Sequence, residues 1–309
     1  MLCTTLIVRP VSLRLGDFVA ERFSAGEDRQ CIVRACEAGG GGDCLFHSIA
    51  AALELMVQID PEAATHVLAR LPLHALTGTK SQAVAHLRRM SVDRLAAWSP
   101  EVLLDYVLCR AMDERLGNSP DGWSPRRLLI TCGFECLLNC ESVLAFGDAV
   151  DGDPGDITMR VAFTDARAGG AHEQRLLGIP QGRTCLEQLR ASLQAELMVS
   201  GNHHWGDQTD VQNLSSALNI GILMCCDRLQ HNRRECFYNI GSQKEVFPYW
   251  VCIWWEEPVH FRLAQFAWRR PTEERDENVL SLQSSCFWSD AALPSAMRAH
   301  YRSCNRMAN

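Results

Sequence analysis

The sequence predicts an α+β fold, in which a helical part precedes a small central β-sheet. Apolar residues recur at intervals of three and four in several stretches before residue 200, which is the spacing of amphipathic helices. After residue 218 the pattern changes to short runs rich in aromatic and β-branched residues, separated by turn residues, as in strands. Helices followed by strands favour one α+β domain.

The composition is that of a soluble globular protein, with 47% hydrophobic and 22% charged residues among 309. The formal net charge of −7 gives no basic excess, so we expect no nucleic-acid partner. No apolar run reaches the roughly 20 residues of a membrane helix, so we expect no membrane partner. Fifteen cysteines, an odd number spread over the chain, favour free thiols in a reducing compartment, the cytoplasm or the nucleus.

We expect three parts along the chain. Residues 1–38 form an N-terminal segment with a strand or two, residues 39–268 form the main domain, and residues 269–309 form a polar C-terminal tail. Within the main domain, about 57–200 is interpreted as an inserted middle region. Helices are predicted at 44–57, 61–71, 81–98, 99–117 and 186–199. The stretch 148–183 is predicted to be irregular, with a short strand at 158–163.

Two capping patterns and four strands complete the outline. Ser99 is a predicted N-cap, followed by Pro100 at the first helical position. Thr209 and Gln212 have the spacing of a capping box before a short helix. A sheet meander of four strands is predicted from the runs NIGILMC, ECFYNI, YWVCIWWEE and HFRLAQFAW.

Cys44 stands where a glycine run meets the first of these helices. A thiol becomes a good nucleophile as the thiolate, and a helix N-terminus lowers a thiol pKa because the helix dipole favours the anion. Gly41 and Gly42 allow unusual backbone conformations and close approach of a substrate. Their N–H groups, with that of Cys44, are candidate donors to an oxyanion. Taken alone, Cys44 is more typical of a buried structural thiol than of a nucleophile.

His260 is the candidate base for this thiol. A nucleophilic cysteine needs a base within hydrogen-bond reach, and that base is usually distant in sequence. His260 follows Pro258 and begins a predicted strand with aromatic neighbours. A cysteine at a helix start beside a histidine on a strand is similar to the arrangement in papain-like proteases, which is an analogy of fold.

Three blocks of residues resemble the OTU (ovarian tumour) family of cysteine proteases. Residues 43–46, Asp-Cys-Leu-Phe, are similar to the family's nucleophile motif, usually written Asp-Gly-Asn-Cys-Leu-Phe. Residues 205–214 resemble its Trp-Gly segment, and residues 259–263 resemble its histidine-bearing strand. The blocks stand in the family's order and mark the two ends of a stretch from about residue 39 to residue 263.

The resemblance implies a papain-like OTU fold and a deubiquitinase, which is a thiol-dependent isopeptidase. Its partners would be ubiquitin or a ubiquitin-like protein and the conjugates of that protein. Cys44 would attack the carbonyl carbon after the C-terminal Gly-Gly, and His260 would move the proton. No metal or organic cofactor would be needed. Trp205, Trp254 and Trp255 are candidate walls of the channel that admits the Gly-Gly tail.

Two positions depart from the family pattern. Gly41 stands where the family has an Asp three residues before the cysteine, and Arg262 stands where it often has Asn or Asp two residues after the histidine. An arginine accepts no hydrogen bond, so the third triad member is open between Asp43, Asp207, Asn239 and an acid from the middle region. The other alternative is a dyad, in which a backbone carbonyl orients the histidine. The alternative function is a catalytically weak or inactive OTU-fold module that binds ubiquitin.

A zinc site is the other class of function to weigh. Cys132, Cys136 and Cys140 are spaced by four, which on one helix would align them along a face. The pairs His203-His204 and Cys225-Cys226 add possible ligands. Zinc sites usually pair two closely spaced cysteines with a second such pair, and no second pair is evident here. A core-facing cysteine stripe is the simpler interpretation.

Overall fold

The computed structural model describes part of the chain, and the described part is α+β as predicted. The described residues are 11–13, 30–59, 61–72, 78–119, 121–148, 159–166, 172–179, 182–230, 233–239, 247–256, 260–269 and 286–287. They belong to two compact units. The first unit comprises Met1–Ser91 and Trp205–Asn309, and the second comprises Val92–His204. No helix within these described ranges has the length and apolar character needed to span a bilayer.

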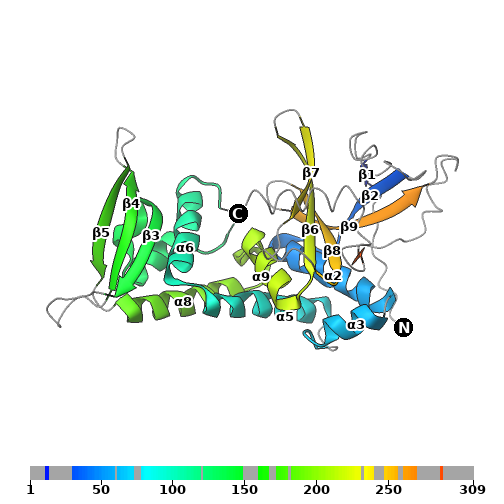
Figure 1. Ribbon diagram of the computed structural model, residues 1–309, viewed down its shortest axis with the longest axis horizontal. Helices are drawn as coiled ribbons and strands as arrows, with labels where there is room; N and C mark the ends of the chain where they lie inside the picture. The colour runs from blue at the N-terminus through cyan, green and yellow to red at the C-terminus, as the bar shows by residue number, and fades with distance from the viewer. Residues whose placement is uncertain are drawn as a thin grey trace. The chain divides into compact units, whose positions relative to one another are not determined.

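The first unit contains a mixed sheet, labelled in Figure 1. Its described strands are β1 (Val11–Leu13), β2 (Gln30–Cys36), β6 (Gly221–Gln230), β7 (Arg233–Asn239), β8 (Trp250–Glu256), β9 (His260–Arg269) and β10 (Cys286–Phe287). Their order across the sheet is β1-β2-β9-β8-β6-β7, and β10 pairs with β8 at Trp250 and Val251. Part of the predicted C-terminal tail therefore adds a strand to the sheet.

The four predicted strands of the meander are all present, but their predicted order is wrong. β7 forms a hairpin with β6, whereas β8 pairs with the other side of β6, and runs parallel to it. The sequences are compatible with this arrangement. β8 is apolar on both faces and occupies an interior position of the sheet, while β7 carries charged residues and lies at the edge, where such residues discourage pairing with other chains.

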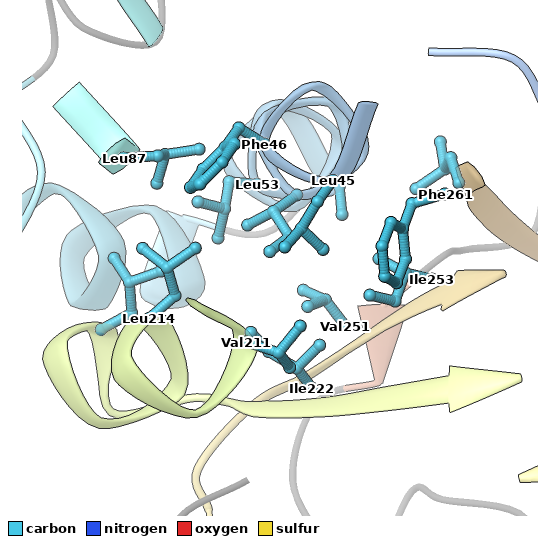
Figure 2. Packing of buried hydrophobic residues seen from close by; sticks show 14 of the residues in the cluster. Leu45, Phe46, Leu53, Leu87, Val211, Leu214, Ile222, Val251, Ile253 and Phe261 are labelled. Atoms are coloured by element: carbon cyan, nitrogen blue, oxygen red, sulfur yellow. The ribbon is translucent and has the colours of Figure 1, made fainter. Parts of the chain in front are cut away.

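Helices of the first unit pack on the sheet and enclose one apolar core. The described helical segments are η1 (Gly41–Asp43), α2 (Cys44–Ile59), α3 (Pro61–Leu68), α5 (Lys80–Asp93) and α9 (Gln208–Leu218). Figure 2 shows how the core is assembled: Phe46 of α2 lies beside Leu87 of α5, while Leu45 points toward the space lined by Val211 of α9 and by Ile253 and Phe261 of the strands. Full burial of such side chains contributes about 1.5–3 kcal/mol each, so this core stabilises the N-terminus of α2 against the sheet.

The second unit has its own core and its own three-stranded sheet. Its described elements are η2 (Arg94–Ala97), α6 (Pro100–Arg115), α7 (Pro125–Thr131), η3 (Glu135–Asn139), β3 (Cys140–Asp148), β4 (Met159–Ala166), β5 (His172–Ile179), α8 (Gly182–Met198) and η4 (Gly201–His203). The strands are antiparallel in the order β3-β4-β5. The stretch predicted to be irregular therefore holds β4 and β5, and α3 and α5, predicted as part of the insertion, belong to the first unit.

Of the two helix caps predicted from the sequence, one is confirmed and the other is wrong. Ser99 is the N-cap of α6, and its hydroxyl accepts a hydrogen bond from the Val102 N–H, as predicted. The capping box of α9 is formed by Asp207 and Asp210, two residues before the predicted start at Thr209. Each of these carboxylates accepts a hydrogen bond from the other residue's backbone N–H, which favours the earlier start because carboxylates are strong acceptors at helix N-termini.

Candidate active site

Cys44 lies at the junction of η1 and α2, as the glycine run predicts. Gly41 has a φ of 69°, a left-handed conformation that favours glycine, and it starts the turn that leads into the helix. The Cys44 side chain is 1% exposed. The Phe261 backbone N–H donates a hydrogen bond to Cys44 Sγ over 3.3 Å. This bond joins the N-terminus of α2 to the first residues of β9, where His260 is located.

The His260 ring is held by a glutamate that sequence reasoning missed. His260 Nε2 lies 2.9 Å from Glu37 Oε2, and the same oxygen lies 3.4 Å from Arg262 Nε. A carboxylate only accepts hydrogen bonds, so Nε2 carries the proton in this contact. Glu37 directly follows β2, the strand beside β9. The neighbouring strand thus supplies an acid next to the histidine.

Asp43 is engaged elsewhere. Its Oδ1 accepts hydrogen bonds from Arg88 Nε at 2.8 Å and from Arg88 Nη2 at 2.5 Å. Arg88 is 1% exposed, and its guanidinium carbon lies 4.5 Å from the centre of the Phe46 ring. Arg88 Nη2 also donates to the Gly42 carbonyl over 3.4 Å. Arg88 therefore joins the turn before the cysteine to α5, and Asp43 serves as its partly buried counter-ion.

The other two candidates for a third triad residue have different roles or positions. Asp207 is the N-cap of α9, and its carboxylate accepts the Asp210 N–H. Asn239 ends β7, which is separated from β9 by β6 and β8. At about 4.8 Å per strand, three strand spacings place the backbone of β7 roughly 14 Å from that of β9. The structure therefore does not bring Asn239 to His260.

The Trp-Gly segment packs directly on the nucleophile helix. A Cβ atom at Gly206 would lie 2.8 Å from Leu45 Cδ2 and 3.0 Å from Phe46 Cε2, so only glycine fits. This close approach lets the Gly206 N–H donate to the Gly42 carbonyl over 3.3 Å. Trp205, which precedes it, is partly buried. The segment acts as a brace for the glycine turn before Cys44.

The thiol is less acidic than the helix start alone predicts. Burial raises the pKa of Cys44, and the Glu37 carboxylate acts in the same direction. Hydrogen bonds from the backbone N–H groups of Phe261 and Leu45 oppose this effect and lower the pKa, but burial is the largest of these influences. The predicted lowering of the Cys44 pKa is therefore wrong for this state of the protein. Desolvation of the charged form outweighs the helix terminus.

The backbone groups of the predicted oxyanion loop are already engaged in hydrogen bonds within the protein. The Cys44 backbone N–H donates to the Gly41 carbonyl within the 3₁₀ turn. Gly41 is exposed, whereas Gly42 is buried, and the Gly42 carbonyl accepts from Gly206 and Arg88. To donate to an oxyanion here, the Cys44 N–H would have to give up its hydrogen bond to the Gly41 carbonyl. Gly41 is exposed, and as a glycine it can adopt conformations at either sign of φ.

Trp254 and Trp255 lie on opposite faces of β8 because side chains alternate along a strand. Trp255 pairs with Phe261 and packs against the core that contains Cys44. Trp254 pairs with Arg262 on the other face and is 4% exposed. The two residues therefore cannot wall the same side of one channel. Trp255 packs against the core under α2, whereas Trp254 shares the face of β9 from which Arg262 and His260 project near the end of the strand.

A second histidine, His47, lies one turn after the nucleophile. Its ring fills the space beside Gly39, where a Cβ atom would overlap it. Burial lowers the pKa of His47, and the nearby Lys80 and Arg88 charges act in the same direction, against Asp43 and Glu37. Lys80 Nζ donates to the Ala38 carbonyl over 3.2 Å. The glycine run before Cys44 is thus held from two sides.

The cysteine stripe proposed for zinc does not form one helical face. α7 ends at Thr131, Cys136 lies in η3, and Cys140 begins β3. His203 Nε2 lies 2.6 Å from Glu196 Oε2, and His204 Nδ1 lies 3.6 Å from Asp121 Oδ1. Across the described ranges, three or more His, Cys, Asp or Glu side chains are nowhere grouped so that they could hold a metal ion. The side chains of Cys225 and Cys226, and Pro258 itself, lie outside what the structure describes.

Among known proteins, the likeness to this chain is structural. No family model matches the sequence, and no curated protein matches it. A solved structure described as an ovarian tumour (OTU) domain in complex with ubiquitin is similar at a TM-score of 0.31 and 10% sequence identity. The alignment covers 87% of this chain and 89% of that chain.

Proposed function

We propose that this chain is a cysteine isopeptidase of the OTU type with a papain-like arrangement, acting on conjugates of ubiquitin or a ubiquitin-like protein. The observation that supports it best is the hydrogen bond from the Phe261 N–H to Cys44 Sγ. It places the nucleophile candidate beside the strand that begins with the base candidate, although 215 residues separate Cys44 from His260 along the chain (260 − 44 − 1). The three OTU-like sequence blocks supply the substrate class.

In the proposed reaction, Cys44 Sγ attacks the carbonyl carbon of the isopeptide bond while its proton passes to His260. Because Nε2 faces Glu37, the ring nitrogen that takes the proton is Nδ1. The tetrahedral intermediate collapses, the carbon–nitrogen bond breaks, and the imidazolium gives its proton to the leaving lysine amine. Water then attacks the thioester with His260 as base, which releases the ubiquitin carboxylate and restores the thiol. We place this reaction in the cytoplasm or nucleus, where Cys44 stays reduced.

A second candidate function is a ubiquitin-binding module with little or no activity. It is favoured by the burial of Cys44, by the raised pKa of its thiol, and by Arg262 at the position where the family often has Asn or Asp. Under the first proposal, substrate binding must open a path to the thiol. Under the second, the thiol stays covered and only the surface of the fold is used.

The test is reaction with ubiquitin that carries an electrophile at its C-terminus, read by intact mass. We expect one adduct on the natural protein and none on Cys44→Ala. Cys109→Ala is the matched control, because it removes an exposed thiol of α6 and should leave the adduct unchanged. His260→Gln should slow the reaction by about 10²-fold or more. A protein that binds ubiquitin without forming an adduct would favour the second candidate, and one that does neither would refute both.

A further inference from the structure

We infer that Glu37 is the positioning residue of the site: it orients the His260 ring and balances the charge the ring gains, in place of an acid on the histidine's own strand. This inference rests on the proposed function for its role in catalysis. Its structural basis is the 2.9 Å contact between Glu37 Oε2 and His260 Nε2.

The pairing of β2 with β9 puts Glu37 at this place. The two strands are antiparallel, and Cys36 lies opposite Leu263. Continuing the register by one residue places Glu37 opposite Arg262. His260 precedes Arg262 by two residues, so both side chains project from the same face of β9. A long side chain reaches the diagonal neighbour on the adjacent strand, which is the contact observed between Glu37 and His260.

The contact determines which ring nitrogen is available as the base. A neutral imidazole has one protonated nitrogen, and an N–H that donates to a carboxylate at Nε2 leaves Nδ1 unprotonated and able to accept the thiol proton. When that proton arrives, the ring becomes a cation beside the Glu37 carboxylate. The negative charge contacts the ring directly and stabilises this cation. The same carboxylate also raises the pKa of Cys44, but this effect is smaller than those of burial and of the Phe261 hydrogen bond, so the stabilised imidazolium favours the state from which the thiolate attacks.

Arg262 completes the arrangement. Its Nε lies 3.4 Å from the same oxygen that contacts His260. The side chain of Glu37 is 43% exposed, and an exposed glutamate loses rotamer freedom when it is held in one geometry. A cation next to the carboxylate on the same face favours the conformation that reaches His260. Arg262 thus occupies the position where the OTU family often has Asn or Asp, and the acid is supplied by Glu37, which follows the neighbouring strand β2.

The face shared by His260 and Arg262 makes a relocation experiment possible. Glu37→Gln keeps the shape of the side chain and removes its charge. Adding Arg262→Asp then places a carboxylate two residues from His260 on the same strand and face. If a carboxylate beside the ring is what matters, the second substitution restores part of what the first removes. A residue that only supported the fold would not be replaced in this way.

The experiment follows the labelling of Cys44 with two reagents, the electrophilic ubiquitin and chloroacetamide, by mass of the Cys44 peptide. We expect Glu37→Gln to slow both reactions by roughly 10- to 100-fold. The double variant Glu37→Gln with Arg262→Asp should recover about tenfold of that loss. Glu187→Gln, the same chemical change at an exposed position of α8, should leave both rates unchanged.

Rates for Glu37→Gln equal to those of the natural protein would overturn the inference. A double variant as slow as Glu37→Gln would assign the loss to local structure and would also overturn it. If the natural protein ignores the ubiquitin reagent while chloroacetamide shows the expected loss and recovery, the positioning role stands and the proposed substrate class fails. The two reagents therefore separate the failure of this inference from the failure of the proposed function.

Discussion

Gly206 is the position where one added methyl group should disturb the site most directly. Its ideal Cβ would lie 2.8 Å from Leu45 Cδ2, 2.9 Å from Leu45 Cβ and 3.0 Å from Phe46 Cε2. Carbon atoms in contact prefer separations of about 3.5–4.0 Å, so Gly206→Ala requires a shift of about 0.5 Å or more. Leu45 and Phe46 are both 0% exposed, within the core under α2, and have no room to retreat.

The Trp-Gly segment must therefore move away from α2, which stretches the hydrogen bond from the Gly206 N–H to the Gly42 carbonyl beyond its present 3.3 Å. Overpacking of this kind costs about 1–3 kcal/mol, and a lost hydrogen bond costs about 1 kcal/mol. We expect the first unit to lose about 2–4 kcal/mol of stability. At about 1.4 kcal/mol per tenfold, amide exchange in α2 should accelerate by roughly 30- to 700-fold.

Hydrogen exchange measured by mass spectrometry reads this effect locally. Peptides of α2 should lose protection, while peptides of α8 in the second unit serve as an internal reference. Gly40→Ala is the matched control, because Gly40 is extended at φ −114° and has no heavy atom within 4 Å of an added Cβ. The reasoning is refuted if α2 keeps its protection in Gly206→Ala, or if Gly40→Ala loses as much.

Three further predictions concern buried charge, pH and packing in the same unit. Arg88→Met should lower the free energy of unfolding, measured in urea, by about 3 kcal/mol, because it leaves the Asp43 carboxylate without its buried partner. Adding Asp43→Asn should recover part of this loss. If the effects of the two substitutions were fully additive, the pairing would be contradicted. Because burial lowers the pKa of His47, its neutral form contributes stability that is present above pH 6.5 and is lost as pH falls through the folded pKa. His47→Gln should therefore lose less stability than the natural protein between pH 7.5 and pH 5, and equal losses would count against this. Gly221→Ala should abolish soluble expression, because the new Cβ would overlap the fully buried Trp250 ring, and a soluble variant with natural stability would show that the ring can move.

The elements that could be predicted from the sequence are those whose signals are local. The helix from Cys44 onward follows from apolar spacing over four turns, and the Ser99 cap follows from a serine, a proline and an apolar run side by side. The four late strands follow from runs of apolar residues. Each of these signals lies within about ten residues of the element it predicts, so no knowledge of distant contacts is needed.

The features that were missed depend on partners far apart in the chain. Strand order in the sheet depends on which edge of β6 receives β8, and both choices satisfy the same apolar pattern. Glu37 lies 223 positions from His260, and Arg88 lies 45 positions from Asp43. A glutamate after a strand looks like an ordinary solvated residue until the register of that strand is known. The cysteine spacing failed for a local reason, because Gly133, at a φ of 82°, follows the C-cap of α7 at Cys132 and ends that helix before Cys136.

The geometry of the site is determined within the first unit, even though 113 residues of the second unit interrupt it between Ser91 and Trp205 (205 − 91 − 1). Ser91 Oγ donates to Asp210 Oδ1 over 2.6 Å, and Asn213 Nδ2 lies 3.4 Å from Ser91 Oγ. These buried bonds join the point where the chain leaves the first unit to the helix that begins just after it returns. They hold the Trp-Gly segment, and through the Gly206–Gly42 hydrogen bond the turn before Cys44, in register with the sheet that carries His260 and Glu37. The Ser91–Asp210 bond is therefore one contact by which the two segments of the first unit, before and after the second unit, are kept together beside the site.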